Sequence, residues 1–363
     1  MERRWRILGG CGLIAGIFLF VQLGALALVQ PFESAGYQAV DDPSDPTNSL
    51  MYVGAILVAT AVMLLAFRYE VDQLIRGLIV FSAAWLSLYV FQVLVPPVLT
   101  YAGFNVVAVL LALGLGTALL VYPEWYVIDA AGAVMGAAAA GLFGISFGVL
   151  PALVLLTVLA VYDAISVYGT EHMLTLASGV MDLRVPVVLV IPMTLSYSYL
   201  DATTPDPAAE ADAGDESTPA EEPATTDADA DTDGPAVADG SQSAGRADEA
   251  TGGDESEAAH AGPLERDALF IGLGDAIIPS ILVASAAFFA SADVLSVFGV
   301  PLPALTAMVG SYVGLTVLLW MVLKGRAHAG LPLLNGGTIA GYIVGALAAG
   351  ISLVDALGLG PYL

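Results

Sequence analysis

Long apolar stretches separated by short polar segments run through most of the 363-residue chain. Each stretch has about 20 residues, which lets a helix cross ~30 Å of hydrocarbon at ~1.5 Å per residue. We therefore expect an all-α, multi-pass membrane protein. Apolar length and the Pro, Gly and charged residues between stretches predict nine transmembrane helices, over residues 7–30, 50–67, 77–95, 98–122, 127–148, 151–169, 268–290, 296–323 and 331–354.

Residues 200–264 interrupt this pattern, because they consist of Asp, Glu, Ala, Thr, Pro and Gly with almost no large apolar side chains. Such a segment cannot bury enough surface to offset its chain entropy, so we expect a disordered cytoplasmic linker. It divides a six-span N-terminal part, residues 1–170, from a three-span C-terminal part, residues 265–363. Residues 171–199 between them are predicted to be a cytoplasmic or interfacial segment.

The composition, 58% hydrophobic and 12% charged, excludes a water-soluble enzyme, since soluble domains carry roughly 25% charged residues. Eighteen acidic residues between Asp201 and Glu257 supply most of the net charge of −25, which argues against a nucleic-acid partner. One Lys beside nine Arg resembles proteins of salt-loving archaea. Cys11 is the only cysteine, which excludes an intrachain disulfide and a multi-cysteine metal site.

The basic residues predict the orientation in the cell membrane, because Lys and Arg are retained on the cytoplasmic side. With nine spans and a cytoplasmic N terminus, all ten basic residues face the cytoplasm. The opposite orientation would place every one outside. We therefore expect a cytoplasmic N terminus and an extracellular C terminus.

Two acidic residues lie well inside predicted spans, away from the span ends: Asp163 in the sixth and Asp275 in the seventh. A charge in this position costs ~2.5–3.5 kcal/mol on insertion scales, so such residues are candidates for function. Counting from the predicted span ends puts both ~9–11 Å below the cytoplasmic face. Two adjacent carboxyl groups that share a proton can activate water and polarise a peptide carbonyl, as in aspartic proteases. The acids alone are equally consistent with a proton- or ion-coupled transporter.

The residues around the two acids carry a family resemblance. Tyr162 precedes Asp163, and the second acid ends the sequence Gly272-Leu273-Gly274-Asp275. With the nine-span topology and the hydrophilic loop between spans six and seven, these motifs resemble the presenilin family of intramembrane aspartyl proteases.

The resemblance implies a presenilin-like fold with Asp163 and Asp275 as the catalytic dyad, and substrate contacts from Tyr162 and residues 272–274. Gly272 and Gly274 would let the substrate backbone approach closely. The implied substrates are transmembrane segments of other proteins in the lipid bilayer. No metal, organic cofactor or obligate accessory subunit is implied. The β-branched stretch 185–191 is expected to hold the extended substrate by backbone pairing.

The family also carries a Pro-Ala-Leu motif at the start of its ninth span. A literal copy at residues 303–305 lies near the start of span eight, on the predicted outer side. We therefore match the motif to Pro332, Leu333 and Leu334, with Leu333 in place of Ala, and count these three among the expected substrate-binding residues.

Several alternatives have weaker support. Signal peptide peptidases share both aspartate motifs but run in the opposite orientation, and prepilin peptidases usually have fewer spans. Residues 144–148 match the Gly-x-Ser-x-Gly pattern without its strand-turn-helix context. The three histidines, His172, His260 and His328, fall in predicted loops, and no His-Glu-x-x-His is present. Four further acids near predicted span ends are expected to be solvated: Glu124, Asp129, Asp293 and Asp355.

Overall fold

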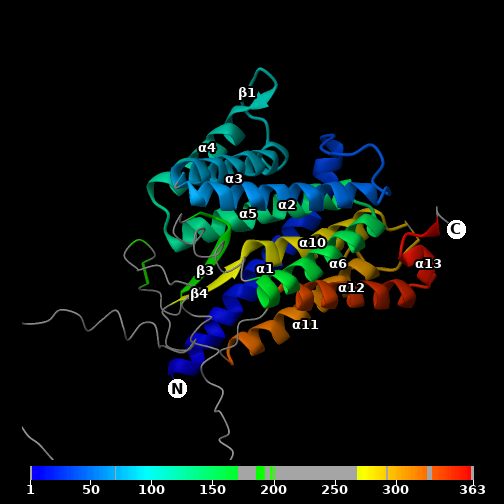
Figure 1. Cartoon of the computed structure of the whole chain (residues 1–363). Coiled ribbons are helices and arrows are strands. Elements are labelled where there is room, and N and C mark those ends of the chain that lie inside the picture. Colours follow the sequence, from blue (N-terminus) through cyan, green and yellow to red (C-terminus); the bar gives the residue numbers. More distant parts are fainter. Residues whose placement is uncertain are drawn as a thin grey trace, which may run out of the picture.

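The computed structural model describes residues 2–69, 71–170, 185–192, 197–198, 200, 268–291, 293–324 and 329–360. Within these ranges nine apolar helices form a bundle (Figure 1), and seven of them are long enough to span a membrane while α4 and α10 are shorter. The predicted nine-helix membrane fold is confirmed. The helices are α1 (Glu2–Ser34), α2 (Thr47–Arg68), α3 (Asp72–Leu94), α4 (Val106–Val121), α5 (Trp125–Ser146), α6 (Val149–Ile165), α10 (Leu273–Phe288), α11 (Leu302–Val322) and α12 (Leu331–Ala348).

Two short antiparallel hairpins precede α4 and α11, where the apolar pattern predicted helix from residues 98 and 296. Each chain reversal places two consecutive residues at positive φ: 50° and 84° at Ala102-Gly103, and 53° and 77° at Phe298-Gly299. Two positive φ angles match the twist of a two-residue hairpin and cannot continue an α-helix. Both predicted helix starts were therefore several residues too early. The strands are β1 (Thr100–Tyr101), β2 (Phe104–Asn105), β5 (Ser296–Val297) and β6 (Val300–Pro301).

A third antiparallel pair joins segments far apart in sequence, β3 (Val188–Pro192) and β4 (Ala268–Gly272). Its register pairs Val188 with Gly272 and Val190 with Phe270. The second strand continues directly into α10, so this helix begins at Leu273 rather than at the predicted residue 268. The chain therefore enters α10 as an extended strand.

The Gly- and Ala-rich helix α5 lies at the centre of the bundle, buried against α1, α3 and α10. A Cβ added to Gly136 would lie 3.3 Å from Ile277 and 3.4 Å from Val21, and Gly144 lies directly against Ala284 of α10. Small residues allow this close approach. The run from Ala130 to Gly144 is therefore a helix-packing face.

Helices α11 and α12 lie side by side through glycines spaced four residues apart (Figure 1). Gly310 of α11 lies against the carbonyl of Gly337, and Gly341 of α12 lies against the carbonyl of Thr306. In lipid there is no hydrophobic driving force between helices. A stripe of small residues instead lets two helix backbones approach closely enough for favourable packing. This contact fixes the position of the first turn of α12, which reaches the site described next.

Candidate active site

Helices α6 and α10 bring Asp163 and Asp275 to the same stretch of backbone at the start of α12. Asp163 is 5% exposed, and its Oδ2 accepts a hydrogen bond from the Leu331 N–H at 3.1 Å. A Cβ added to Gly330 would lie 2.9 Å from Oδ2 of Asp275. The two carboxyl groups thus converge on the peptide between Gly330 and Leu331.

The backbone before α12 is held at two points. The first turn of a helix has N–H groups without intrahelical partners, and Leu331 donates one of these to Asp163. Two residues earlier, the Ala329 N–H donates to the Tyr168 hydroxyl at 3.2 Å. Tyr168 belongs to the π-helical turn η1 (Ser166–Thr170) that continues α6. The end of α6 therefore positions the entry to α12.

The residues matched to the Pro-Ala-Leu motif lie in this first turn. Pro332 occupies one of the first two helical positions, where its missing N–H costs nothing. Leu334 is fully buried, and the carbonyl of Leu333 lies against Gly314 of α11. These residues pack α12 onto α11 directly beside the two aspartates.

The literal Pro-Ala-Leu copy lies elsewhere. Residues 303–305 begin α11, where the neighbouring Leu302 and Thr306 pack against Gly345. Gly345 is ~21 Å along α12 from Leu331 at ~1.5 Å per residue. The copy at 303–305 therefore lies at the opposite end of α12 from the aspartates.

Gly272 and Gly274 flank the approach to Asp275 and are exposed. Gly272 has φ −60°, which any residue adopts, and a Cβ on it would come no nearer than 3.7 Å, to Asp275 itself. The nearest atom to a Cβ on Gly274 is 3.9 Å away, on Ile278. Neither backbone conformation nor packing within the described residues requires glycine here.

Leu273 and Tyr162 occupy different surroundings. Leu273 is 2% exposed and packs toward Gly132 and Gly136 of α5, while its N–H donates to the Val187 carbonyl at 2.8 Å. The side chain of Leu273 is therefore part of the core. Tyr162 is partly buried beside Asp163, and its carbonyl accepts a hydrogen bond from the Ser166 hydroxyl. Substrate contact by either residue stays a prediction.

Two acids expected to be solvated are buried, so that prediction was wrong for Glu124 and Asp129. Each is 6% exposed. Asp129 Oδ1 accepts from the Val190 N–H at 2.8 Å, and Glu124 Oε1 accepts from the Ser198 hydroxyl at 2.8 Å. Residues after α6 return to cover the start of α5, which span lengths alone do not reveal. Asp293 and Asp355 are exposed, as expected.

Sequence reasoning also missed Gly330 and Leu331, because it began the motif at Pro332, and Tyr168, whose contact with Ala329 joins segments distant in sequence. The signal available in the sequence was Pro332, because a proline marks the first turn of a helix. Backbone N–H groups in that turn lack helical partners and can bind a carboxylate. The three histidines and residues 201–264 lie outside the described residues. Within the described ranges, no group of three or more His, Cys, Asp or Glu side chains could hold a metal ion.

Comparisons with known proteins show the family to which this chain is similar. The family model described as "Signal-peptide peptidase, presenilin aspartyl protease" matches residues 15–351. A solved structure of a presenilin family intramembrane aspartate protease, in space group C222, is 33% identical, with 94% of this chain and 99% of that chain covered and a TM-score of 0.58. A P2 structure of such a protease gives 31% identity, 92% and 96% coverage, and a TM-score of 0.54. A search of curated proteins gave no match.

Proposed function

This chain belongs to the signal-peptide peptidase and presenilin family of aspartyl proteases, and we propose that Asp163 and Asp275 are its catalytic dyad. The chain is an intramembrane aspartyl protease, an enzyme class that cleaves transmembrane substrates. The convergence of both carboxyl groups on the Gly330–Leu331 peptide is the observation that carries the assignment. The two aspartates come from different helices, α6 and α10, and meet at the start of a third helix, α12, which supports it further.

The chemistry needs one ionised and one protonated carboxyl group. The ionised group takes a proton from water, whose oxygen attacks the scissile carbonyl carbon, while the protonated partner donates a hydrogen bond to the carbonyl oxygen. The tetrahedral intermediate collapses when the C–N bond breaks and the leaving nitrogen takes a proton. Placing both acids in a site away from bulk water favours sharing one proton, since two like charges at close range in low dielectric repel strongly.

The substrate must reach these carboxyl groups in an extended form, because hydrogen bonds within a helix shield its peptide bonds. We propose that the β3–β4 sheet receives the unwound segment as a further strand. The continuity of β4 with Gly272 and Gly274 supports this, because the strand leads to Asp275 within three residues. The exposed backbone of both glycines is consistent with close approach by substrate. We propose that Pro332, Leu333 and Leu334, at the start of α12, shape the side of the substrate site opposite β4.

We also propose that the protein lies in the cell membrane with a cytoplasmic N terminus and an extracellular C terminus. The predicted placement of all ten basic residues on one side supports this orientation. From the polar composition of residues 200–264 we divide the chain into a six-span part, residues 1–170, a linker region and a three-span part, residues 265–363. Labelling of single cysteines from either face of sealed vesicles tests the orientation.

The dyad is tested by cleavage of a synthetic single-span peptide by the purified full chain in lipid. Wild type is compared with Asp163→Ala and Asp275→Ala, and mass spectrometry locates the cut. We expect cleavage within the apolar segment by wild type and its loss in both variants, at unchanged thermal stability. Cleavage that survives either substitution would show that the assigned aspartate is not part of the dyad.

A further inference from the structure

The two edges of β3 have different roles. In an antiparallel pair, successive residues alternate between bonding to the partner strand and directing their N–H and C=O groups to the opposite side. Leu273 N–H donates to the Val187 carbonyl, in the same register as the β3–β4 pairs. The odd-numbered residues of this segment therefore bond to β4. The even-numbered residues face the opposite side, which we call the outer edge of β3.

Three of the four even-numbered residues from 186 to 192 leave the outer edge without an available donor. Pro186 and Pro192 have no N–H. The N–H of Val190 donates to Asp129 Oδ1 at 2.8 Å. Prolines and a capped N–H are ways in which sheet edges resist a further strand. An incoming strand is thereby directed away from β3 and onto β4, against the expectation that residues 185–191 themselves pair with the substrate.

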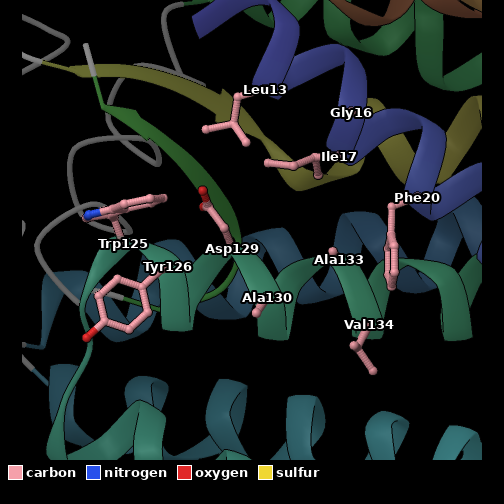
Figure 2. Close-up of a pocket in the computed structure, with 10 residues that line it drawn as sticks. All are labelled: Leu13, Gly16, Ile17, Phe20, Trp125, Tyr126, Asp129, Ala130, Ala133 and Val134. Atoms are coloured by element: carbon pink, nitrogen blue, oxygen red, sulfur yellow. The ribbon is translucent and has the colours of Figure 1, made fainter. Parts of the chain in front are cut away.

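Asp129 lies on the face of α5 that supports β3. Figure 2 shows its carboxyl group pointing from α5 toward the strand. One turn along the same face, a Cβ on Gly132 would lie 3.4 Å from the Leu189 side chain and 3.6 Å from the Pro186 carbonyl. Gly132 thus lets β3 lie on the helix, while the hydrogen bond from Val190 determines where along the helix it lies.

The surroundings of Asp129 leave no other evident role for it. Its Oδ2 is buried and has no hydrogen-bond partner among the described residues. A cavity of about 360 Å³ adjoins it between α1 and α5 and is otherwise apolar, with lining that includes Leu13, Phe20, Trp125 and Val134 (Figure 2). Burying a carboxyl group in such surroundings costs free energy, so we expect the one interaction that it makes to matter. The interaction it makes is with the strand.

We propose that Asp129 is a positioning residue for the protease, which sets the register of β3 on α5 and so the position of the β4 edge that holds the substrate beside Asp275. This inference rests on the proposed function. A slip of one residue would turn every side chain of the strand to its other face and move the ribbon by ~3.3 Å. Because β4 runs into Asp275 within three residues, such a slip would displace the substrate from the dyad.

The test compares Asp129→Leu, Asp129→Asn and Val190→Pro in the full chain, with the single-span peptide as substrate. The leucine variant removes the acceptor while keeping a side chain branched at Cγ, and the asparagine variant keeps an acceptor oxygen. The proline variant removes the donor at a position that does not bond to β4. We expect Asp129→Leu and Val190→Pro each to lower kcat at least about tenfold, because the bound substrate lies out of line with the dyad, and Asp129→Asn to restore kcat to within about twofold.

The combined Asp129→Leu and Val190→Pro variant separates this hydrogen bond from general damage. If both substitutions remove one interaction, the double variant lowers kcat no more than either single variant. An unchanged kcat in Asp129→Leu, or an asparagine variant as impaired as the leucine one, would overturn the inference. If Asp129→Leu does not fold, Val190→Pro decides by the same criterion.

Failure of the proposed function would look different. It would appear as a wild type that does not cleave, or as cleavage that survives Asp275→Ala, whatever residue 129 is. Thermal unfolding of each variant confirms that the compared proteins are folded.

Discussion

Glycines in two regions of this protease serve opposite purposes. Between α11 and α12, a Cβ on Gly310, Gly337 or Gly341 would run into backbone atoms of the facing helix. Beside Asp275, a Cβ on Gly272 or Gly274 would meet nothing nearer than 3.7 Å. The helix pair needs glycine in order to fold, whereas the residues beside the dyad do not. Gly272 and Gly274 are not required by the fold, so they leave open space beside Asp275. We propose that the substrate backbone occupies this space.

The largest effect is expected at the helix contact. Gly337→Ala places a methyl group against the Gly310 carbonyl, and backbone atoms cannot rotate away as a side chain can. We expect the free energy of unfolding to fall by about 1–3 kcal/mol, the usual cost of overpacking, measured by thermal or denaturant unfolding in detergent. Gly310→Ala should behave alike, since it fills the same contact from the other side. Unchanged stability in both would mean that α11 and α12 can separate without cost.

Gly330 combines the two cases, because the atoms nearest to its added Cβ belong to Asp275 itself. Gly330→Ala would push the carboxyl group aside at little cost to the fold, since this group ends a short side chain. We expect kcat to fall about tenfold while stability changes by less than about 1 kcal/mol, because a displacement of ~1 Å at reacting groups can cost up to 100-fold in rate. Single-turnover cleavage alongside thermal unfolding checks both parts. A loss of stability without loss of kcat would contradict the proposed place of Asp275.

Gly274→Ala should affect substrate binding and leave the fold intact. Its Cβ would project into space that is exposed in the described structure, so no loss of stability is expected. If the substrate backbone occupies that space, KM rises by roughly threefold to tenfold, a typical cost of about 1 kcal/mol for a mild steric conflict. Michaelis–Menten analysis with the single-span peptide measures it. A normal KM would indicate that the substrate approaches Asp275 from another direction.

The apolar helices, and the presence of two acidic residues inside them, could be predicted because both depend on local sequence. Apolar length identifies a span, and a carboxylate within a span stands out by its solvation cost. The meeting of Asp163 and Asp275 at Gly330 depends on how α12 packs against α11, which no local pattern specifies. The β5–β6 hairpin was missed because apolar residues such as Val297 and Val300 look alike in strands and helices. Asp129 was placed in solvent because the segment that buries it is distant in sequence.

Gly336→Ala is expected to have the smallest effect, and it supplies the control for the first prediction. Gly336 precedes Gly337 in α12, is exposed, and has no neighbour within 4 Å of an added Cβ. Alanine there restricts the unfolded chain and suits the helix, so the free energy of unfolding should rise by about 0.4–1 kcal/mol with unchanged cleavage. Gly337→Ala has the same stabilising contribution, so its net loss in the free energy of unfolding is smaller than the cost of the steric clash alone. The difference between these adjacent variants isolates the cost of forcing α11 and α12 apart.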